Sequence, residues 1–289
     1  YLVIASTHTH EAPDLLGLWG ESPFRSGVNK EWKEYVKERV VQSVVDAVEV
    51  MRPACFRFSQ NLTEGKVTIK DTREPYVFDE GLRMMQVTDA ETSETLGTLI
   101  QWANHPETLW SKNLLISSDF PHYLRKAVEK GVYHGDSLIR KGAGGVALYV
   151  NGAVGGLMTT HASMEVVDPF RDTVYLDPSF DKIRAQGDTL GLIILRTIEE
   201  KAVEIREASI NLRAKTLDLP LRNRLFRLAA AIGIMDADMT GWMKKRTEVA
   251  VWSIGPASFI TFPGELYPEI LNGGVVALSG RDIPVVPLE

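Results

Sequence analysis

Two histidines one residue apart stand near the start of the chain, in the stretch STHTH. Alternate residues of a strand face the same side, so the imidazoles of His8 and His10 would point toward a shared centre. Far away in the chain, NHPETLW offers His105 and Glu107, and FPGELYPEI offers Glu265. Imidazole and carboxylate groups suit zinc, which in catalytic sites keeps one position open for water. The three stretches together indicate a metal site.

Other interpretations of these residues stay open at this point. A histidine beside a proline is also typical of a loop residue with a local hydrogen bond, and the short zinc motif H-E-x-x-H is absent from the sequence. Two glycine-rich stretches, KGAGG (141–145) and NGAVGG (151–156), raise phosphate binding as a second hypothesis. Neither matches a P-loop or the dinucleotide fingerprint. We interpret the remaining histidines, His122, His134 and His161, as surface or loop residues. His161, which follows the glycine-rich stretch, is also a candidate spare ligand.

The elements that must carry these clusters can be predicted from hydrophobic periodicity. YLVIAS (1–6) is an unbroken apolar run, typical of a strand covered on both faces, and ligands bind at the carboxyl ends of such strands. Periodicity and end signals predict helices at 29–51, 119–131, from about 179 onward, and at 221–235. Strands are expected at 55–60, 66–70, 81–89, 95–104, 145–152, 207–217 and, as a pair with a Gly-Pro turn, within 248–265.

This pattern predicts an α/β protein with a mixed, largely buried β-sheet flanked by helices. No repeat or flexible linker divides it, so we expect one large domain over residues 1–289. The chain opens on Tyr1, without an initiator Met or the regions of a signal peptide. We therefore expect a chain truncated at both ends.

Composition excludes several classes of protein. The formal charge of −6 and the lack of a dense basic cluster beyond MKKR argue against nucleic-acid binding. The most apolar candidate span, TLGLIILRTI, is too short for a bilayer and contains Arg196. A single cysteine, Cys55, excludes an intramolecular disulfide framework and a cysteine-based zinc site. A small or neutral partner is the expectation that remains.

Three stretches carry a resemblance to a known family, the neutral and alkaline non-lysosomal ceramidases. THTHEAPD resembles the THTHSGPG signature of that family, and ANHPETLW with SSDFPHYL is similar to its HPTSM and SSDNxGYA elements. FPGELYPEI resembles the segment of its metal-binding glutamate. The matches occur in family order, and the resemblance implies an α/β catalytic domain with one zinc ion.

The resemblance also implies roles for particular residues. It makes His8, His105 and Glu265 metal ligands and His10 a candidate general acid or base beside the metal. Arg73 in DTREP is similar to an arginine of the family, which would place a cation near a developing oxyanion. A solvated arginine in a loop is the alternative. Asp119 falls at the aspartate of the SSD element, although a helix N-cap explains it as well.

The implied activity is zinc-dependent hydrolysis of the C–N amide bond of an N-acyl, ceramide-like substrate by metal-activated water. A lipid-like partner, peripheral contact with a membrane, and a secreted or periplasmic location follow from the same resemblance. Two departures matter. The family's catalytic serine aligns with Gly155, and its fourth ligand, a tyrosine after the glutamate, has no counterpart beyond Tyr267. The alternative is a non-catalytic metal- or ligand-binding domain of the same fold.

Overall fold

A computed structural model describes residues 1–289 apart from 72–76, 157, 236–243, 273, 279–280 and 286–289. The chain divides into two compact units, and each is described here by itself. The first comprises residues 1–11, 53–208 and 264–289, and the second comprises residues 12–52 and 209–263. The expectation that residues 1–289 form one catalytic domain stays a prediction.

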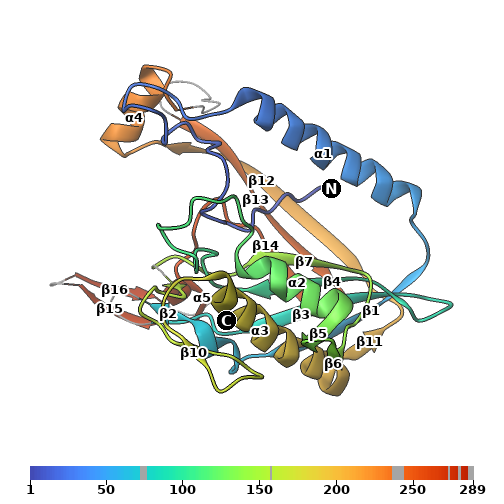
Figure 1. Ribbon diagram of the computed structural model, residues 1–289. Helices are drawn as coiled ribbons and strands as arrows, with labels where there is room; N and C mark the ends of the chain where they lie inside the picture. Colours follow the sequence, from blue (N-terminus) through green and yellow to red (C-terminus); the bar gives the residue numbers. More distant parts are fainter. Residues whose placement is uncertain (72–76, 157, 236–243, 273, 279–280, 286–289) are drawn as a thin grey trace. The chain divides into compact units, whose positions relative to one another are not determined.

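The first unit is built on a five-stranded mixed sheet (Figure 1). Its strand order is β11-β1-β3-β4-β7, and every neighbouring pair is antiparallel except β4 and β7, which are parallel. The strands are β1 (Ala54–Asn61), β3 (Leu82–Asp89), β4 (Thr95–Trp102), β7 (Val146–Asn151) and β11 (Val203–Ile205). The predicted mixed α/β class is therefore confirmed, as is the hairpin expected between 81–89 and 95–104.

Two helices of this unit, α2 (Phe120–Lys130) and α3 (Phe180–Lys201), lie side by side against the sheet (Figure 1). Each begins where it was predicted to begin: the side chain of Asp119, the predicted cap, accepts from the Phe120 N–H, and that of Ser179 accepts from the Lys182 N–H. The helices approach closely at glycines: a Cβ on Gly191 would lie 2.4 Å from that of Ala127. Their apolar faces join the sheet in one core that includes Trp102, Phe120, Leu124, Ile183, Leu190 and Ile194.

Shorter elements complete the first unit. They are the 3-10 turn η1 (Gly65–Thr68), the pairs β2 (Lys70–Asp71) with β8 (Met158–Thr159), β5 (Gly131–His134) with β6 (Ser137–Lys141), and β9 (Val166–Val167) with β10 (Val174–Tyr175), the helix α5 (Pro268–Asn272), and the pair β15 (Gly274–Leu278) with β16 (Arg281–Val285).

Two predicted strands of this unit are wrong. Residues 66–70 form a 3-10 turn and only the start of a strand, because the Trp102 Nε1–H donates to the Gly65 carbonyl oxygen at 3.1 Å and draws the backbone into the turn. Residues 1–6 form no strand, and most of their side chains are exposed. The apolar run signalled hydrophobicity, which does not by itself provide a partner strand.

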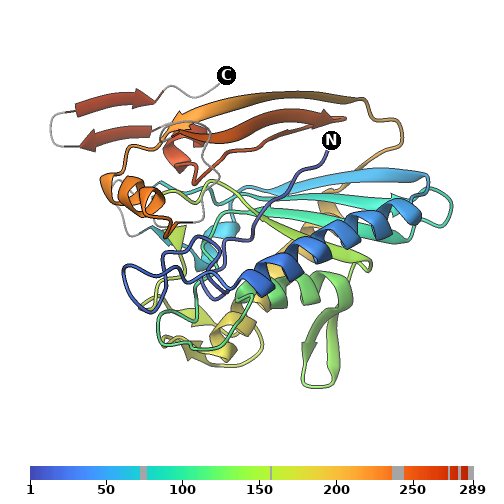
Figure 2. The same ribbon diagram turned by 90° about the horizontal axis from the view of Figure 1, so that it is seen from above.

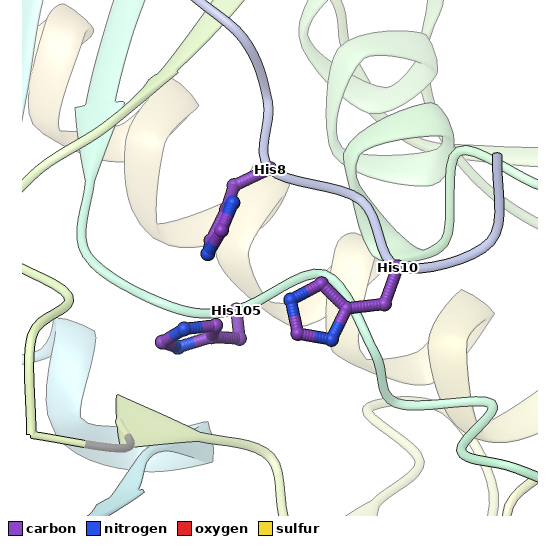
Figure 3. Close-up of side chains that lie close together, drawn as sticks. All are labelled: His8, His10 and His105. Carbon is purple, nitrogen blue, oxygen red and sulfur yellow. The ribbon is translucent and has the colours of Figure 1, made fainter. Parts of the chain in front are cut away.

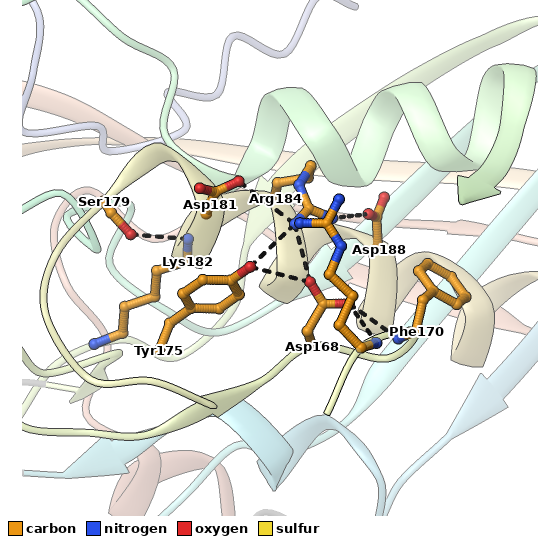
Figure 4. Close-up of polar contacts among 9 residues, drawn as sticks. Asp168, Phe170, Tyr175, Ser179, Asp181, Lys182, Arg184 and Asp188 are labelled. Carbon is orange, nitrogen blue, oxygen red and sulfur yellow. Dashed lines mark hydrogen bonds and ion pairs between the residues drawn. The ribbon is translucent and has the colours of Figure 1, made fainter. Parts of the chain in front are cut away.

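A polar network ties the loop between β8 and α3 to that helix (Figure 4). The buried carboxylate of Asp168 accepts from the Phe170 N–H at 3.0 Å, from the Tyr175 hydroxyl at 3.2 Å and from the Arg184 guanidinium at 2.9 Å. Nearby, the Lys182 ammonium donates to the Leu176 carbonyl oxygen at 2.8 Å. These bonds link both halves of the loop to α3.

The second unit contains the helix α1 (Lys30–Glu49) and a three-stranded antiparallel sheet of order β12-β13-β14. The strands are β12 (Ile210–Pro220), β13 (Lys244–Ile254) and β14 (Ala257–Ile260), with α4 (Arg224–Ala231) after the first. Figure 2 shows the long ribbons of β12 and β13 running side by side. The predicted helices and strands of this unit are confirmed within the described residues. No helix in the described part of the chain has the length and apolarity needed to cross a membrane.

Candidate metal centre

Three histidines from two distant stretches lie together in the first unit (Figure 3). His8, His10 and His105 each offer one ring nitrogen, and these nitrogens lie within 4.8 Å of one another. The ring centroids are 4.9 to 5.5 Å apart. The side chain of His105 is buried, whereas the other two are partly exposed. Such a cluster brings donor atoms together on one side while leaving access to solvent on the other.

The first two histidines converge for a reason other than the predicted strand alternation. His8 has a φ of 65°, a left-handed conformation that is uncommon for residues other than glycine. The following segment is then held by bonds to the loop after β4: the His10 N–H donates to the Pro106 carbonyl oxygen at 3.2 Å, and the Thr9 hydroxyl donates to the Ser117 carbonyl oxygen at 3.1 Å. A turn and a docked loop, instead of a strand, bring the imidazoles together.

His105 follows the carboxyl end of β4 and is fixed by one backbone carbonyl. The Met158 carbonyl oxygen accepts from the His105 backbone N–H at 3.1 Å and lies 2.6 Å from Nδ1. A carbonyl oxygen only accepts, so Nδ1 carries a proton and a lone pair of this ring can only be at Nε2. This is the usual arrangement behind a metal-binding histidine.

Glu265 lies between two of the imidazoles, although 160 residues separate it from the nearer one in sequence. Its Oε1 is 3.1 Å from Nε2 of His8, and its Oε2 is 3.6 Å from Nε2 of His105. The structure therefore brings all three predicted ligands to one place. Burial, then the neighbouring charge of His105, lowers the pKa of His8 below its usual value. The neutral form of His8, which offers a lone pair, is thereby favoured near neutral pH.

His10 has a carboxylate partner of its own. Its Nδ1 is 2.7 Å from Oε2 of Glu107, and the hydrogen bond to that carboxylate raises the pKa of His10. Burial raises the pKa of Glu107, but the bond from His10 and other bonds outweigh it and leave the pKa lowered. Sequence reasoning named Glu107 without giving it a role. Its place two residues after a predicted ligand was the only signal.

The carboxyl groups of Glu11 and Asp119 interact with each other beside the cluster. Burial, then the charge of Asp119, raises the pKa of Glu11 to about 7. Asp119 itself is fully buried: one oxygen caps α2, and the other accepts from the Leu109 N–H at 3.0 Å. The N-cap interpretation of Asp119 is therefore confirmed.

Other residues singled out in the sequence lie elsewhere or outside the described part of the chain. Arg73 falls within 72–76, which the structure does not describe. The His161 ring packs against Trp110 at 5.0 Å between centroids, with its Nδ1 2.7 Å from the Ser163 hydroxyl, so it is not one of the clustered imidazoles. Gly155 lies against the backbone that follows Glu265.

The residues present fit a zinc ion. Zinc at 2.0–2.1 Å from tetrahedral ligands places neighbouring donor atoms about 3.4 Å apart. The gap of 3.1 Å between His8 and Glu265 and that of 3.6 Å between His105 and Glu265 are close to this spacing. Two imidazoles and a carboxylate match the ligand set of a catalytic zinc site.

Comparison with known proteins places the fold. No family model and no curated protein sequence matches the chain. The neutral ceramidase of Pseudomonas aeruginosa is similar over 79% of this chain and 43% of its own, with 14% identity and a TM-score of 0.53. A ceramidase complexed with C2 is similar over 90% of this chain and 50% of its own, with 15% identity and a TM-score of 0.61. The resemblance predicted from the three motifs is thus confirmed for the fold, and the chain spans about half the length of these solved chains.

Proposed function

We propose that this protein is a zinc-dependent hydrolase that cleaves the C–N amide bond of an N-acyl, ceramide-like substrate by metal-activated water. The observation that carries this proposal is that the carboxylate of Glu265 lies within 3.6 Å of ring nitrogens of both His8 and His105. The fold shared with two ceramidase structures supports the substrate class. A bound zinc ion would lower the pKa of a water to about 7 and polarise the amide carbonyl.

His8, His105 and Glu265 would hold the ion. The Met158 carbonyl keeps the Nε2 lone pair of His105 directed at the centre, and burial keeps His8 neutral. Glu265 supplies a negative charge that would partly neutralise the cation. Its two oxygens already face both imidazoles, so little rearrangement of the chain is needed for binding.

His10 would move the protons of the reaction. Glu107 accepts a hydrogen bond from Nδ1, so the proton of interest is held at Nε2. The carboxylate stabilises the charged imidazolium, as the raised pKa of His10 indicates. His10 can then protonate the departing amine nitrogen, the step that makes an amide bond break. The oxyanion role of Arg73 stays a prediction.

The test is metal analysis and turnover in matched variants. Purified protein should hold one zinc per chain, and His8→Ala and His105→Ala should each weaken zinc binding at least about 100-fold, since each removes one of three ligands. His122→Ala, whose ring lies against Tyr123, is the control. Hydrolysis of an N-acyl sphingoid base should follow zinc content. Unchanged metal content in both ligand variants would remove this function.

Gly155 favours a second candidate, a metal- or ligand-binding domain without turnover. The family's catalytic serine aligns with Gly155, and a side chain there would meet the Leu266 backbone at 2.9 Å. Turnover of an N-acyl amide that requires zinc and is lost in His10→Ala would exclude this candidate. Zinc binding with no turnover of any N-acyl amide would favour it.

The proposal extends to membrane contact and to the location of the protein. A lipid-like N-acyl substrate would bring the chain to a membrane surface, with peripheral contact, outside the cytosol. Vesicles that contain ceramide offer the direct measurement, because co-sedimentation of the chain with them should exceed co-sedimentation with vesicles of phosphatidylcholine alone. Equal sedimentation with both would argue against membrane contact.

A further inference from the structure

The glycine-rich stretch at the end of β7 contacts all three segments that carry the proposed ligands. It comprises residues 151–155, which we name the 151–155 segment, and three of its hydrogen bonds reach these ligand segments. One ends beside His8, one beside His105 and one beside Glu265. These ligand segments are far apart in the sequence, and this short stretch is a common neighbour of all three.

The side chain of Asn151 makes two of these bonds. Its Nδ2 donates to the Thr7 carbonyl oxygen at 2.7 Å, and its Oδ1 accepts from the Asn104 N–H at 3.2 Å. The Tyr149 hydroxyl donates to the same Oδ1 at 2.8 Å, which fixes the orientation of the amide. Thr7 precedes His8 and Asn104 precedes His105, so one side chain sets the spacing between two ligands.

Gly155 makes the third bond. Its N–H donates to the Leu266 carbonyl oxygen at 2.9 Å. A Cβ at this position would lie 2.9 Å from the carbonyl carbon and oxygen of Leu266 and from the nitrogen of Tyr267. These are backbone atoms, which cannot turn aside as a flexible side chain can. The absence of a side chain at 155 therefore permits the close approach that places Glu265.

We propose that the 151–155 segment is the positioning element of the metal centre, with Asn151 and Gly155 as positioning residues, an inference that rests on the proposed ligand roles. The close approach at Gly155 serves the protein's own backbone, which gives the glycine a use other than phosphate binding. Partners that orient ligands from behind typically contribute 10- to 100-fold to metal affinity. A serine introduced at 155 would accordingly weaken the site.

Asn151→Asp tests the amide bridge. The variant keeps nearly the same size and one acceptor oxygen, but it loses the donor to Thr7. Its added negative charge alone would favour a cation, so weaker binding can arise only from lost positioning. We expect zinc affinity, measured by competition with a chelator, to fall 10- to 100-fold. The absorption bands of bound Co²⁺ should change as well. Asn211→Asp, an exposed position in β12, is the control and should leave both unchanged.

Gly155→Ala tests the close approach, with Gly97→Ala in β4 as its control. We expect a similar 10- to 100-fold loss of zinc affinity in the first and less than a threefold change in the second. Circular dichroism checks folding of both. If Gly155→Ala does not fold, the Asn151→Asp result decides alone. Wild-type affinity in a folded Asn151→Asp would overturn the inference.

A readout without metal separates this inference from the proposed function. In zinc-free protein, hydrogen exchange should be about tenfold faster over residues 1–11 in Asn151→Asp and over 264–272 in Gly155→Ala, because each loses its anchor. Faster exchange together with no zinc binding by the wild type would support the positioning element and remove the proposed function. Unchanged exchange in both variants would overturn the positioning element whatever the wild type binds.

Discussion

The histidine cluster and the Asp168 network are both groups of polar side chains in the first unit, but their charges are balanced differently. In the network, Arg184 faces three carboxylates, and Asp168 accepts hydrogen bonds from backbone, hydroxyl and guanidinium donors (Figure 4). In the cluster, the imidazoles of His8, His10 and His105 lie close together (Figure 3). Glu265 is the acid beside two of them. The network supplies its own cation.

This difference distinguishes a structural group from a candidate site. In the network, the Arg184 guanidinium already neutralises the Asp168 carboxylate, so no bound ion is needed. Its bonds then stabilise the loop that they connect to α3. In the histidine cluster, ring nitrogens of His8 and His105 instead share the single carboxylate of Glu265, an arrangement that a bound cation would stabilise. Burial raises the pKa of Asp168, but its bonds from Phe170 and Arg184 outweigh burial and leave the pKa lowered. For His8, burial and the neighbouring imidazoles outweigh the opposing effect of Glu265, so its pKa is lowered and the neutral form is favoured.

Breaking the network should cost stability and leave metal binding intact. Arg184→Met keeps the aliphatic packing but leaves the buried Asp168 carboxylate without its guanidinium. We expect the free energy of unfolding to fall by about 3 kcal/mol, the cost of an unpaired buried charge. Urea unfolding measures it, and zinc titration should give the wild-type affinity. A large loss of zinc affinity would contradict the separation of the two regions.

Removing the charge behind His10 should slow turnover without releasing metal. Glu107→Gln retains a hydrogen-bonding oxygen but no longer stabilises an imidazolium. We expect kcat for an N-acyl amide to fall about tenfold, with KM and zinc content close to wild type. Glu91→Gln, in an exposed turn, is the matched control. A loss of zinc in place of turnover would instead make His10 a ligand.

The smallest effect concerns the pH dependence of stability. The folded pKa of Glu11, about 7, exceeds its ordinary value of 4.5, so the folded state holds a proton that the unfolded state releases between these values. The stability that Glu11 contributes through this bound proton is fully present below pH 4.5 and is lost as the pH rises through 7. Zinc-free Glu11→Gln should therefore gain stability relative to the wild type between pH 4 and pH 8, on the order of 1 kcal/mol because the residue is only partly buried.

Thermal unfolding across that range provides the measurement. Glu94→Gln, at an exposed position of the β3–β4 turn, serves as the control. Parallel pH curves for Glu11→Gln and the wild type would mean that Glu11 ionises in the folded state as easily as in the unfolded one.

Local signals in the sequence were enough for much of the fold. The Asp119 cap and the 3.6-residue periodicity predicted α2 and α3, and the polar AETSE stretch predicted the β3–β4 hairpin. The failures at 1–6 and 66–70 involve tertiary contacts. A strand needs a partner that an apolar run does not specify, and the bond from Trp102 to Gly65 joins residues far apart in sequence.

In the candidate site, too, local signals predicted some features, and those that depend on tertiary contacts were not predicted. His8, His105 and Glu265 were identified by residue type and by resemblance, because ligand chemistry is carried by the side chains themselves. The roles of the supporting partners were not predicted, although Glu107 itself was named. Glu107 and Asn151 act through hydrogen bonds that exist only once distant segments have met, and the tight contact at Gly155 is a property of the folded backbone.

The left-handed backbone of His8 has one more consequence. A residue with a Cβ adopts this conformation at some cost in energy, and the surrounding contacts must maintain it. An ion held by the His8 imidazole would anchor the same bend from its side-chain end. Binding and release of an ion should therefore change the ordering of the amino-terminal residues 1–7, which would be more ordered when the centre is occupied.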